Sequence, residues 1–317
     1  MTAIITAPDH EVPATTELIA PKISRYKRMF PTVGVLLSWM FLLTLTFMAV
    51  FADYLPFIRS TQTVVKASGR SGVRFGFGPG FTAWFGTDTL GKDVFAKCIY
   101  GARVTLFVGV LATIIGLTIG GILGLAAGYF RGWVDRVVSI LTDCLLALPP
   151  LLLAIILVFR LDDLKAKWSW ISWLDRRWQI TLTLGILAIA PLARIVRAQT
   201  LSLREREFVL AARSLGAKNG RIVVREILPN LIPTMMTVAF TGLGILIAAE
   251  GALAFLGLSV EIPTPTWGKL IDDNKNKIDV AWWAEIFPSL MLFLTVLAFS
   301  VIGDRLSRRF DIREAGV

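Results

Sequence analysis

Six long apolar segments constrain the fold of this 317-residue chain more than any other feature. A helix needs roughly 20 mostly apolar residues to cross a bilayer, and each segment reaches or approaches that length. Lipid offers no partner for free backbone groups, so each span is expected to be helical. The segments lie at residues 31–52, 104–128, 137–159, 179–197, 231–257 and 283–303. The sequence therefore predicts an all-α membrane protein with six spans.

The overall composition agrees with a membrane protein. Hydrophobic residues make up 55% of the chain and the mean hydropathy is +0.67, whereas soluble domains contain about 45–50% apolar residues. The first apolar run is too long for the core of a signal peptide, so we interpret it as a retained span. The net charge of +10 does not indicate nucleic-acid binding, because no soluble domain carries a basic and aromatic face.

The positions of the basic residues predict the orientation. Basic clusters precede the first span and follow the last one, and an even number of spans puts both clusters on the same side. The charged connection between the fourth and fifth spans falls on that side too. We therefore expect a membrane protein with both termini in the cytoplasm. The predicted segments are a cytoplasmic tail (1–30), a first span (31–52), an extracytoplasmic segment (53–103), a five-span core (104–304) and a second cytoplasmic tail (305–317).

The sequence lacks the residues for histidine-based catalysis or a zinc site and a complete nucleotide-binding motif. Two cysteines, Cys98 and Cys144, and one histidine, His10, cannot build a metal cage or a histidine-based active site. The run Gly86-Thr-Asp-Thr-Leu-Gly-Lys-Asp93 approaches the phosphate-binding P-loop, but Asp93 replaces the required hydroxyl and no apolar strand precedes it. We expect no catalytic residue, cofactor or metal site in this chain.

The connection between the fourth and fifth spans, about residues 198–230, is unusually structured for a loop. Phe208, Ala211, Ala212 and Leu215 fall at helical spacing on one side, with charged residues around them. Gly216 is placed to end this helix in a left-handed cap, and Asn219-Gly220 is typical of a turn. This pattern predicts a short amphipathic helix that docks a partner protein; the alternative is an ordinary surface helix linking two spans.

The same segment resembles the EAA loop of ABC importer permeases, in which Ala-Ala, a Gly four residues later and a terminal Leu-Pro recur. The matching residues are Ala211, Ala212, Gly216, Leu228 and Pro229. Leu210 stands where Glu is usual and Glu226 where Ile is usual, and both departures are familiar in the peptide/nickel subclass. The resemblance implies that contact with an ATPase depends on Glu207, Phe208, Ala211, Ala212, Arg213, Leu215, Gly216 and Pro229.

Three further segments resemble signatures of C-type dipeptide/oligopeptide permeases. They begin at Gly86, Gly128 and Phe255 and follow the order expected in that family. The resemblance implies a six-helix type I ABC importer permease domain in the bacterial inner membrane that is not itself an enzyme. It implies as partners a B-type permease, an extracytoplasmic substrate-binding protein and two cytosolic ATPases, which bind ATP and magnesium. Di- or oligopeptides are the default substrate; nickel, glutathione or another small solute is the alternative.

Two acidic residues, Asp143 and Glu250, lie inside apolar spans. A carboxylate inside the membrane normally faces a cavity, a partner or the bundle interior. One hypothesis is that they line the translocation path, and the other is that they brace helices or a subunit contact.

Three other local patterns predict features of the helices. Four glycines spaced by four in the second span predict close helix packing, and Pro149-Pro150 predicts a break in the third span. The Trp-rich segment 165–178 predicts an aromatic belt at the lipid surface.

Two other classes of protein compete with an importer subunit. A self-sufficient secondary transporter is expected to contain inverted repeats around discontinuous spans, and no internal repeat is evident. A membrane scaffold without transport activity would use the docking helix for assembly alone.

Overall fold

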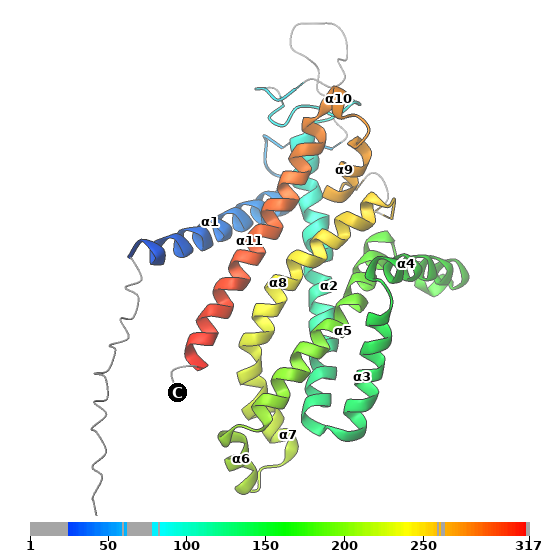
Figure 1. Ribbon diagram of the computed structural model, residues 1–317. Coiled ribbons are helices and arrows are strands. Elements are labelled where there is room, and N and C mark those ends of the chain that lie inside the picture. The colour runs from blue at the N-terminus through cyan, green and yellow to red at the C-terminus, as the bar shows by residue number, and fades with distance from the viewer. Residues whose placement is uncertain are drawn as a thin grey trace, which may run out of the picture.

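The protein is a bundle of long helices (Figure 1). The computed structural model describes residues 25–58, 60–61, 78–81, 83–258, 260 and 264–314, and no β-strand occurs among them. The predicted all-α fold is confirmed. The long helices are α1 (Arg25–Val50), α2 (Val94–Phe130), α3 (Gly132–Ala147), α4 (Pro150–Lys167), α5 (Arg176–Arg204), α8 (Leu228–Phe255) and α11 (Trp283–Glu314). The short ones are η1 (Ser169–Ile171), α6 (Glu207–Ser214), α7 (Asn219–Arg221), η2 (Ile222–Ile227), α9 (Trp267–Asn274) and α10 (Ile278–Ala281).

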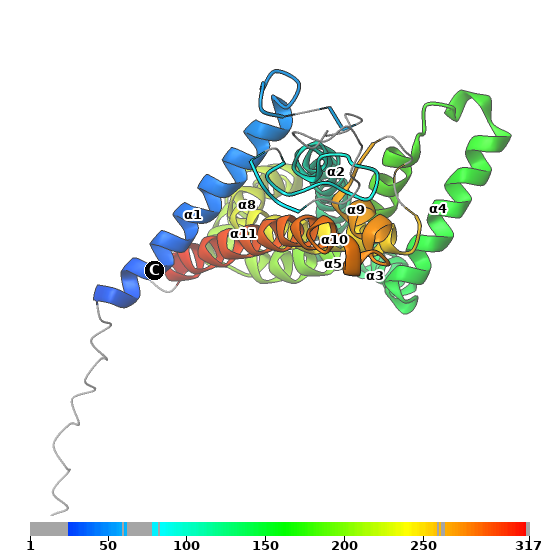
Figure 2. The same ribbon diagram turned by 90° about the horizontal axis from the view of Figure 1, so that it is seen from above.

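Five of these helical segments are long and apolar enough to cross a membrane, and a sixth span exists if the bent pair α3 and α4 counts as one. The bend between α3 and α4 is 96°. It occurs where predicted, because Leu148 and Pro149 leave the helical conformation and Pro150 begins α4. The predicted third span is therefore a sharply bent helix pair, a broken span or a re-entrant loop, and α4 projects from the bundle on the side opposite α1 (Figure 2).

The glycines of α2 allow α5 to lie directly against it. A Cβ atom added at Gly116 would come within 2.5 Å of the Cβ of Ala188, and one at Gly124 within 2.4 Å of the carbonyl oxygen of Ala193. No side chain fits into such gaps. The close packing predicted from the four-residue glycine spacing is confirmed, and α2 and α5 form the centre of the bundle.

The start of α2 differs from the prediction. The sequence placed residues 94–103 in the extracytoplasmic segment before the second span, but they are the first turns of α2. The Asp93 carboxylate caps the helix by accepting hydrogen bonds from the backbone N–H groups of Phe95 and Ala96 at 2.9 and 3.3 Å. Nothing after Ala96 interrupts the helix, so α2 continues for 37 residues, about 55 Å.

The P-loop-like run is a capped turn. The Asp88 carboxylate accepts hydrogen bonds from the backbone N–H groups of Leu90 and Lys92, both at 2.8 Å, and pairs with the Lys97 ammonium at 2.5 Å. Together with the Asp93 cap, these bonds occupy backbone donors that a phosphate would need. His10 lies outside the described residues.

Exposed tryptophans follow α4. Trp168, Trp170 and Trp173 expose 53–71% of their surface, and Trp168 packs edge-on against Trp170. Their role as an aromatic belt stays a prediction.

Candidate functional site

The charged connection between α5 and α8 folds into a compact element at one end of the bundle (Figure 1). It consists of α6, α7 and η2, and we call it the α6 loop. The expected short helix over these residues is present as α6, which begins at Glu207 and ends at Ser214.

The inward side of the α6 loop is apolar. Val209, Ile222 and Ile227 are fully buried and form one core cluster with Tyr129 from α2. Ala212 is half-buried against this cluster. Burial of each large aliphatic side chain stabilises the contact by about 1.5–3 kcal/mol. The α6 loop is therefore packed onto the end of α2 rather than hanging free.

Polar contacts reinforce this attachment. The Tyr129 hydroxyl donates a hydrogen bond to the side-chain carbonyl of Asn219 at 2.8 Å. The Arg204 guanidinium lies 5.8 Å from the centre of the Tyr129 ring, and Arg131 pairs with Glu205. The α6 loop is therefore attached to α2, which in turn packs against α5 at the centre of the bundle.

Gly216 ends α6 as predicted. Its φ of +81° is in the left-handed region, and the N–H of Ala217 donates to the carbonyl of Ala212 at 3.1 Å while the N–H of Gly216 donates to Arg213 at 3.0 Å. These two bonds define a Schellman motif. The motif turns the chain back toward the membrane helices immediately after α6.

The outward side of α6 is exposed and partly apolar. Leu215 exposes 89% of its surface and Phe208 exposes 37%. Glu207, Ala211, Arg213 and Pro229 are exposed too. Of the eight residues expected to contact an ATPase, Ala212 alone lies on the inward edge of α6. Val209, which holds α6 in place, was not singled out from the sequence, although it precedes Ala212 by three residues and so shares its edge of the helix.

The approach to α8 also differs from the prediction. Asn219-Gly220 was expected to be a turn, but Asn219 begins α7, which continues through the π-helix η2 into α8 without a break. The extra residue of a π-helical turn frequently marks a functional site. Here it shifts the register just before Pro229 in the first turn of α8.

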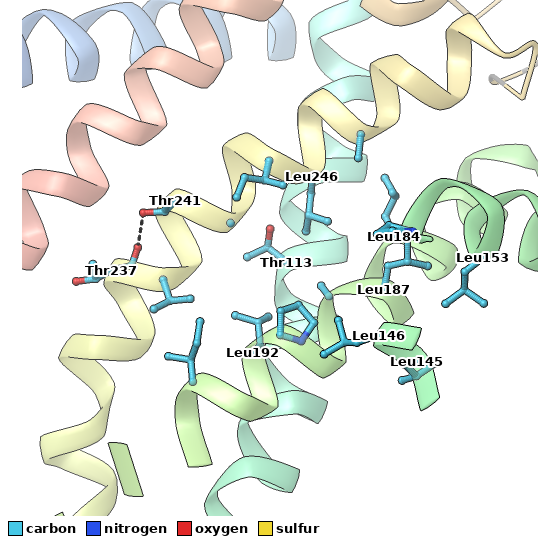
Figure 3. Close-up of a pocket in the computed structure, with 18 residues that line it drawn as sticks. Thr113, Leu145, Leu146, Leu153, Leu184, Leu187, Leu192, Thr237, Thr241 and Leu246 are labelled. Carbon is cyan, nitrogen blue, oxygen red and sulfur yellow. Dashed lines mark hydrogen bonds between the residues drawn. The ribbon is translucent and has the colours of Figure 1, made fainter. Parts of the chain in front are cut away.

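A cavity of about 480 Å³ opens between the helices of the bundle (Figure 3). Its walls are leucines and other apolar side chains of α3, α4, α5 and α8, with Thr113 of α2. The hydroxyls of Thr113, Thr237 and Thr241 donate to carbonyls of their own helices. The cavity therefore offers an apolar surface with few free polar groups.

The two membrane carboxylates lie in different surroundings. Asp143 pairs with the Arg194 guanidinium at 2.5 Å and lines a second, polar pocket of about 360 Å³ between α3 and α5. Glu250 is 1% exposed and accepts a hydrogen bond from the Thr105 hydroxyl at 3.3 Å. It lies inside the subunit and in neither cavity. The sequence did not reveal Arg194 as the partner of Asp143, because only the packing of α3 on α5 brings them together.

Residues 116–315 match the family described as the inner membrane component of binding-protein-dependent transport systems. The chain belongs to this family. It is 39% identical to the dipeptide transport system permease protein DppC of Alkalihalophilus pseudofirmus over 74% of this chain and 73% of that protein. It is 35% identical to the glutathione transport system permease protein GsiD of Pectobacterium atrosepticum over 75% of each chain.

Solved structures agree on the fold. A chain of the MetNI methionine ABC transporter in an inward-facing conformation superposes with a TM-score of 0.54 at 18% identity, covering 68% of this chain and 97% of that one. The predicted ABC importer permease fold is confirmed, and this family member is a multi-pass membrane permease.

Proposed function

We propose that this permease is the C-type subunit of an ATP-driven importer of di- or oligopeptides, and that the α6 loop is its contact with a cytosolic ATPase. The main support for the proposal is that one side of α6 is buried against the bundle and the other is exposed. Val209 fixes α6 to α2 from within, while Leu215, 89% exposed, and Phe208, 37% exposed, present apolar surface on the outward side. Exposed apolar patches of this kind mark interaction sites.

The mechanism is a rigid-body movement imposed by the partner. When the nucleotide-bound ATPases close, they displace α6, and the Tyr129 cluster passes the displacement to α2 and α5. The helices around the apolar cavity then change their spacing. The path switches between inward-open and outward-open states because the ATPase binds one arrangement better than the other. No bond is made or broken in this chain.

The proposal includes the full set of partners: a second, B-type permease, two ATPases and a binding protein outside the membrane. Both termini and the α6 loop then lie in the cytoplasm, and α9 lies outside. The dipeptide and glutathione names of the relatives support a peptide-like substrate. Nickel or another small solute remains the alternative substrate, and the binding protein is expected to make most of the selection.

The test is uptake of dialanine by cells that contain the complete transporter. Gly216→Pro and Ala212→Asp are expected to abolish uptake while the protein stays in the membrane. The first disrupts the end of α6, where Gly216 has a positive φ, and the second disrupts the packing of α6 against α2. Ala166→Asp, the same change on an exposed face of α4, is the matched control and retains uptake. Normal uptake by the two α6-loop variants at matched expression refutes the assignment.

A secondary transporter gives a different result. Its uptake persists when the ATPase genes are deleted, whereas the proposed importer loses uptake completely. A scaffold gives no substrate-stimulated ATP hydrolysis when all partners are present.

A further inference from the structure

We propose that Asp143 and Arg194 form a binding site for the two charged ends of a zwitterionic solute as it crosses the membrane. The carboxylate of Asp143 would receive an ammonium group and the guanidinium of Arg194 a carboxylate group. This inference rests on the proposed function as a permease, and it adds the class of substrate that the path favours.

The depth of the pair requires an explanation. Asp143 lies eleven residues after the start of α3, and Arg194 ten residues before the end of α5. Within the spans predicted from the sequence, Asp143 lies six residues inside the third span (137–159) and Arg194 three residues before the end of the fourth (179–197), about 9 and 5 Å from the cytoplasmic edge. Charged groups at this depth face a water-filled cavity or a partner rather than lipid.

The pair is accessible from a cavity. The Asp143 side chain is 62% exposed and that of Arg194 is 53% exposed. Both line the polar pocket of about 360 Å³, which has room for about a dozen waters at about 30 Å³ each. Leu145 and Leu146 continue from Asp143 into the large apolar cavity, as Leu192 and Ile195 do beside Arg194. The two pockets are therefore lined by neighbouring residues of α3 and α5.

A neighbouring ion pair shows what a purely structural contact looks like here. Arg197 holds Asp135 through two nitrogens, one of them at 2.7 Å, and the side chains are only 36% and 22% exposed. Arg194 holds Asp143 through a single nitrogen and both are more exposed. An exposed, single-contact ion pair contributes little stability. A solute with an ammonium and a carboxylate can therefore take the place of each side chain's partner with little loss of stability.

The balance of charge identifies the solute class. Asp143 and Asp135 offset Arg194 and Arg197, so the pocket is neutral but strongly dipolar. A free ammonium and a free carboxylate on one molecule match it, as in an unblocked peptide. A bare divalent cation would meet the guanidinium beside the carboxylate, and no group of three or more metal-binding side chains occurs in the described chain.

The experiment compares wild type with the double variant Asp143→Asn/Arg194→Gln in proteoliposomes that contain the complete transporter. The double variant removes both charges together, so it leaves no uncompensated charge in the membrane. Dialanine is the probe, and binding-protein-stimulated ATP hydrolysis is measured beside uptake. The control is Asp162→Asn/Arg176→Gln, which removes an Asp–Arg pair of 2.8 Å between α4 and α5, outside both cavities.

We expect maximal uptake by the double variant to fall about tenfold or more, the effect of losing two charge-assisted hydrogen bonds. The apparent affinity, set by the binding protein, stays unchanged, and so do ATP hydrolysis and uptake by the control. Wild-type uptake by the double variant overturns this inference alone. Failure of the wild-type transporter to import dialanine at all overturns the proposed peptide function instead.

Discussion

Replacing Gly216 by alanine tests the geometry of the α6 loop with the smallest possible change. A Cβ at this position meets no atom within 4 Å, so the substitution causes no clash. Its cost comes only from the φ of +81°, which is unfavourable for an L-residue by roughly 1–2 kcal/mol. That energy lowers the population of the capped conformation roughly 5- to 30-fold relative to the alternatives.

The assay is binding-protein-stimulated ATP hydrolysis, measured together with dialanine uptake in the reconstituted transporter. We expect Gly216→Ala to reduce both in proportion, and Gly216→Asn to reduce them less, because asparagine tolerates the left-handed conformation better. Gly220→Ala is the matched control, since Gly220 lies in the same loop, meets nothing within 4 Å and has no positive φ. If Gly216→Ala behaves like Gly220→Ala, the capped end of α6 does not govern coupling.

Three further predictions follow from the packing and charges. Gly124→Ala should lower the free energy of unfolding by about 1–3 kcal/mol through overpacking, because the new Cβ would clash with α5. Gly34→Ala, where the new Cβ lies in open space on α1, should leave it unchanged. Equal melting temperatures of these two variants would contradict the prediction. Tyr129→Phe and Asn219→Ala should each weaken the attachment of the α6 loop to α2 by about 0.5–1.5 kcal/mol, because each removes their shared hydrogen bond. Their effects on stimulated ATP hydrolysis should not add in the double variant, and full additivity would show that the hydrogen bond is irrelevant. Hydrogen bonds from Tyr100 and Arg103 lower the pKa of Asp53, so its contribution to stability is present above the ordinary pKa of about 4 and is lost as the pH falls below it. Asp53→Asn should therefore reduce the melting temperature more at pH 6 than at pH 3, and identical melting temperatures of the variant and the wild type at pH 6 would refute this.

Much of the fold follows from local properties of the sequence. Apolar length located the spans, the glycine spacing indicated the α2–α5 contact, and Pro149-Pro150 indicated the break between α3 and α4. Gly216 and its neighbours gave the end of α6. Each of these depends on residues close together in the chain, where propensity and periodicity act directly.

The missed features depend on contacts between distant segments or on competition between local signals. Asn219-Gly220 has the composition of a turn, but burial of Ile222 and Ile227 against Tyr129 stabilises a helix there instead. Arg194 was not paired with Asp143 because 51 residues separate them. The start of α2 was placed too late because a charged residue, Arg103, interrupts the apolar run, yet it donates hydrogen bonds to α1 and Asp53.

The central claim is that the α6 loop lies in the cytoplasm against a separate ATPase. Leu215→Cys, in a Cys144→Ser background, tests it directly with a membrane-impermeant maleimide. Labelling is expected in inside-out vesicles stripped of the ATPases, absent in intact cells and blocked when the ATPases are added back. Labelling of Cys at this position from the outside of intact cells, or labelling unaffected by the ATPases, would contradict the account.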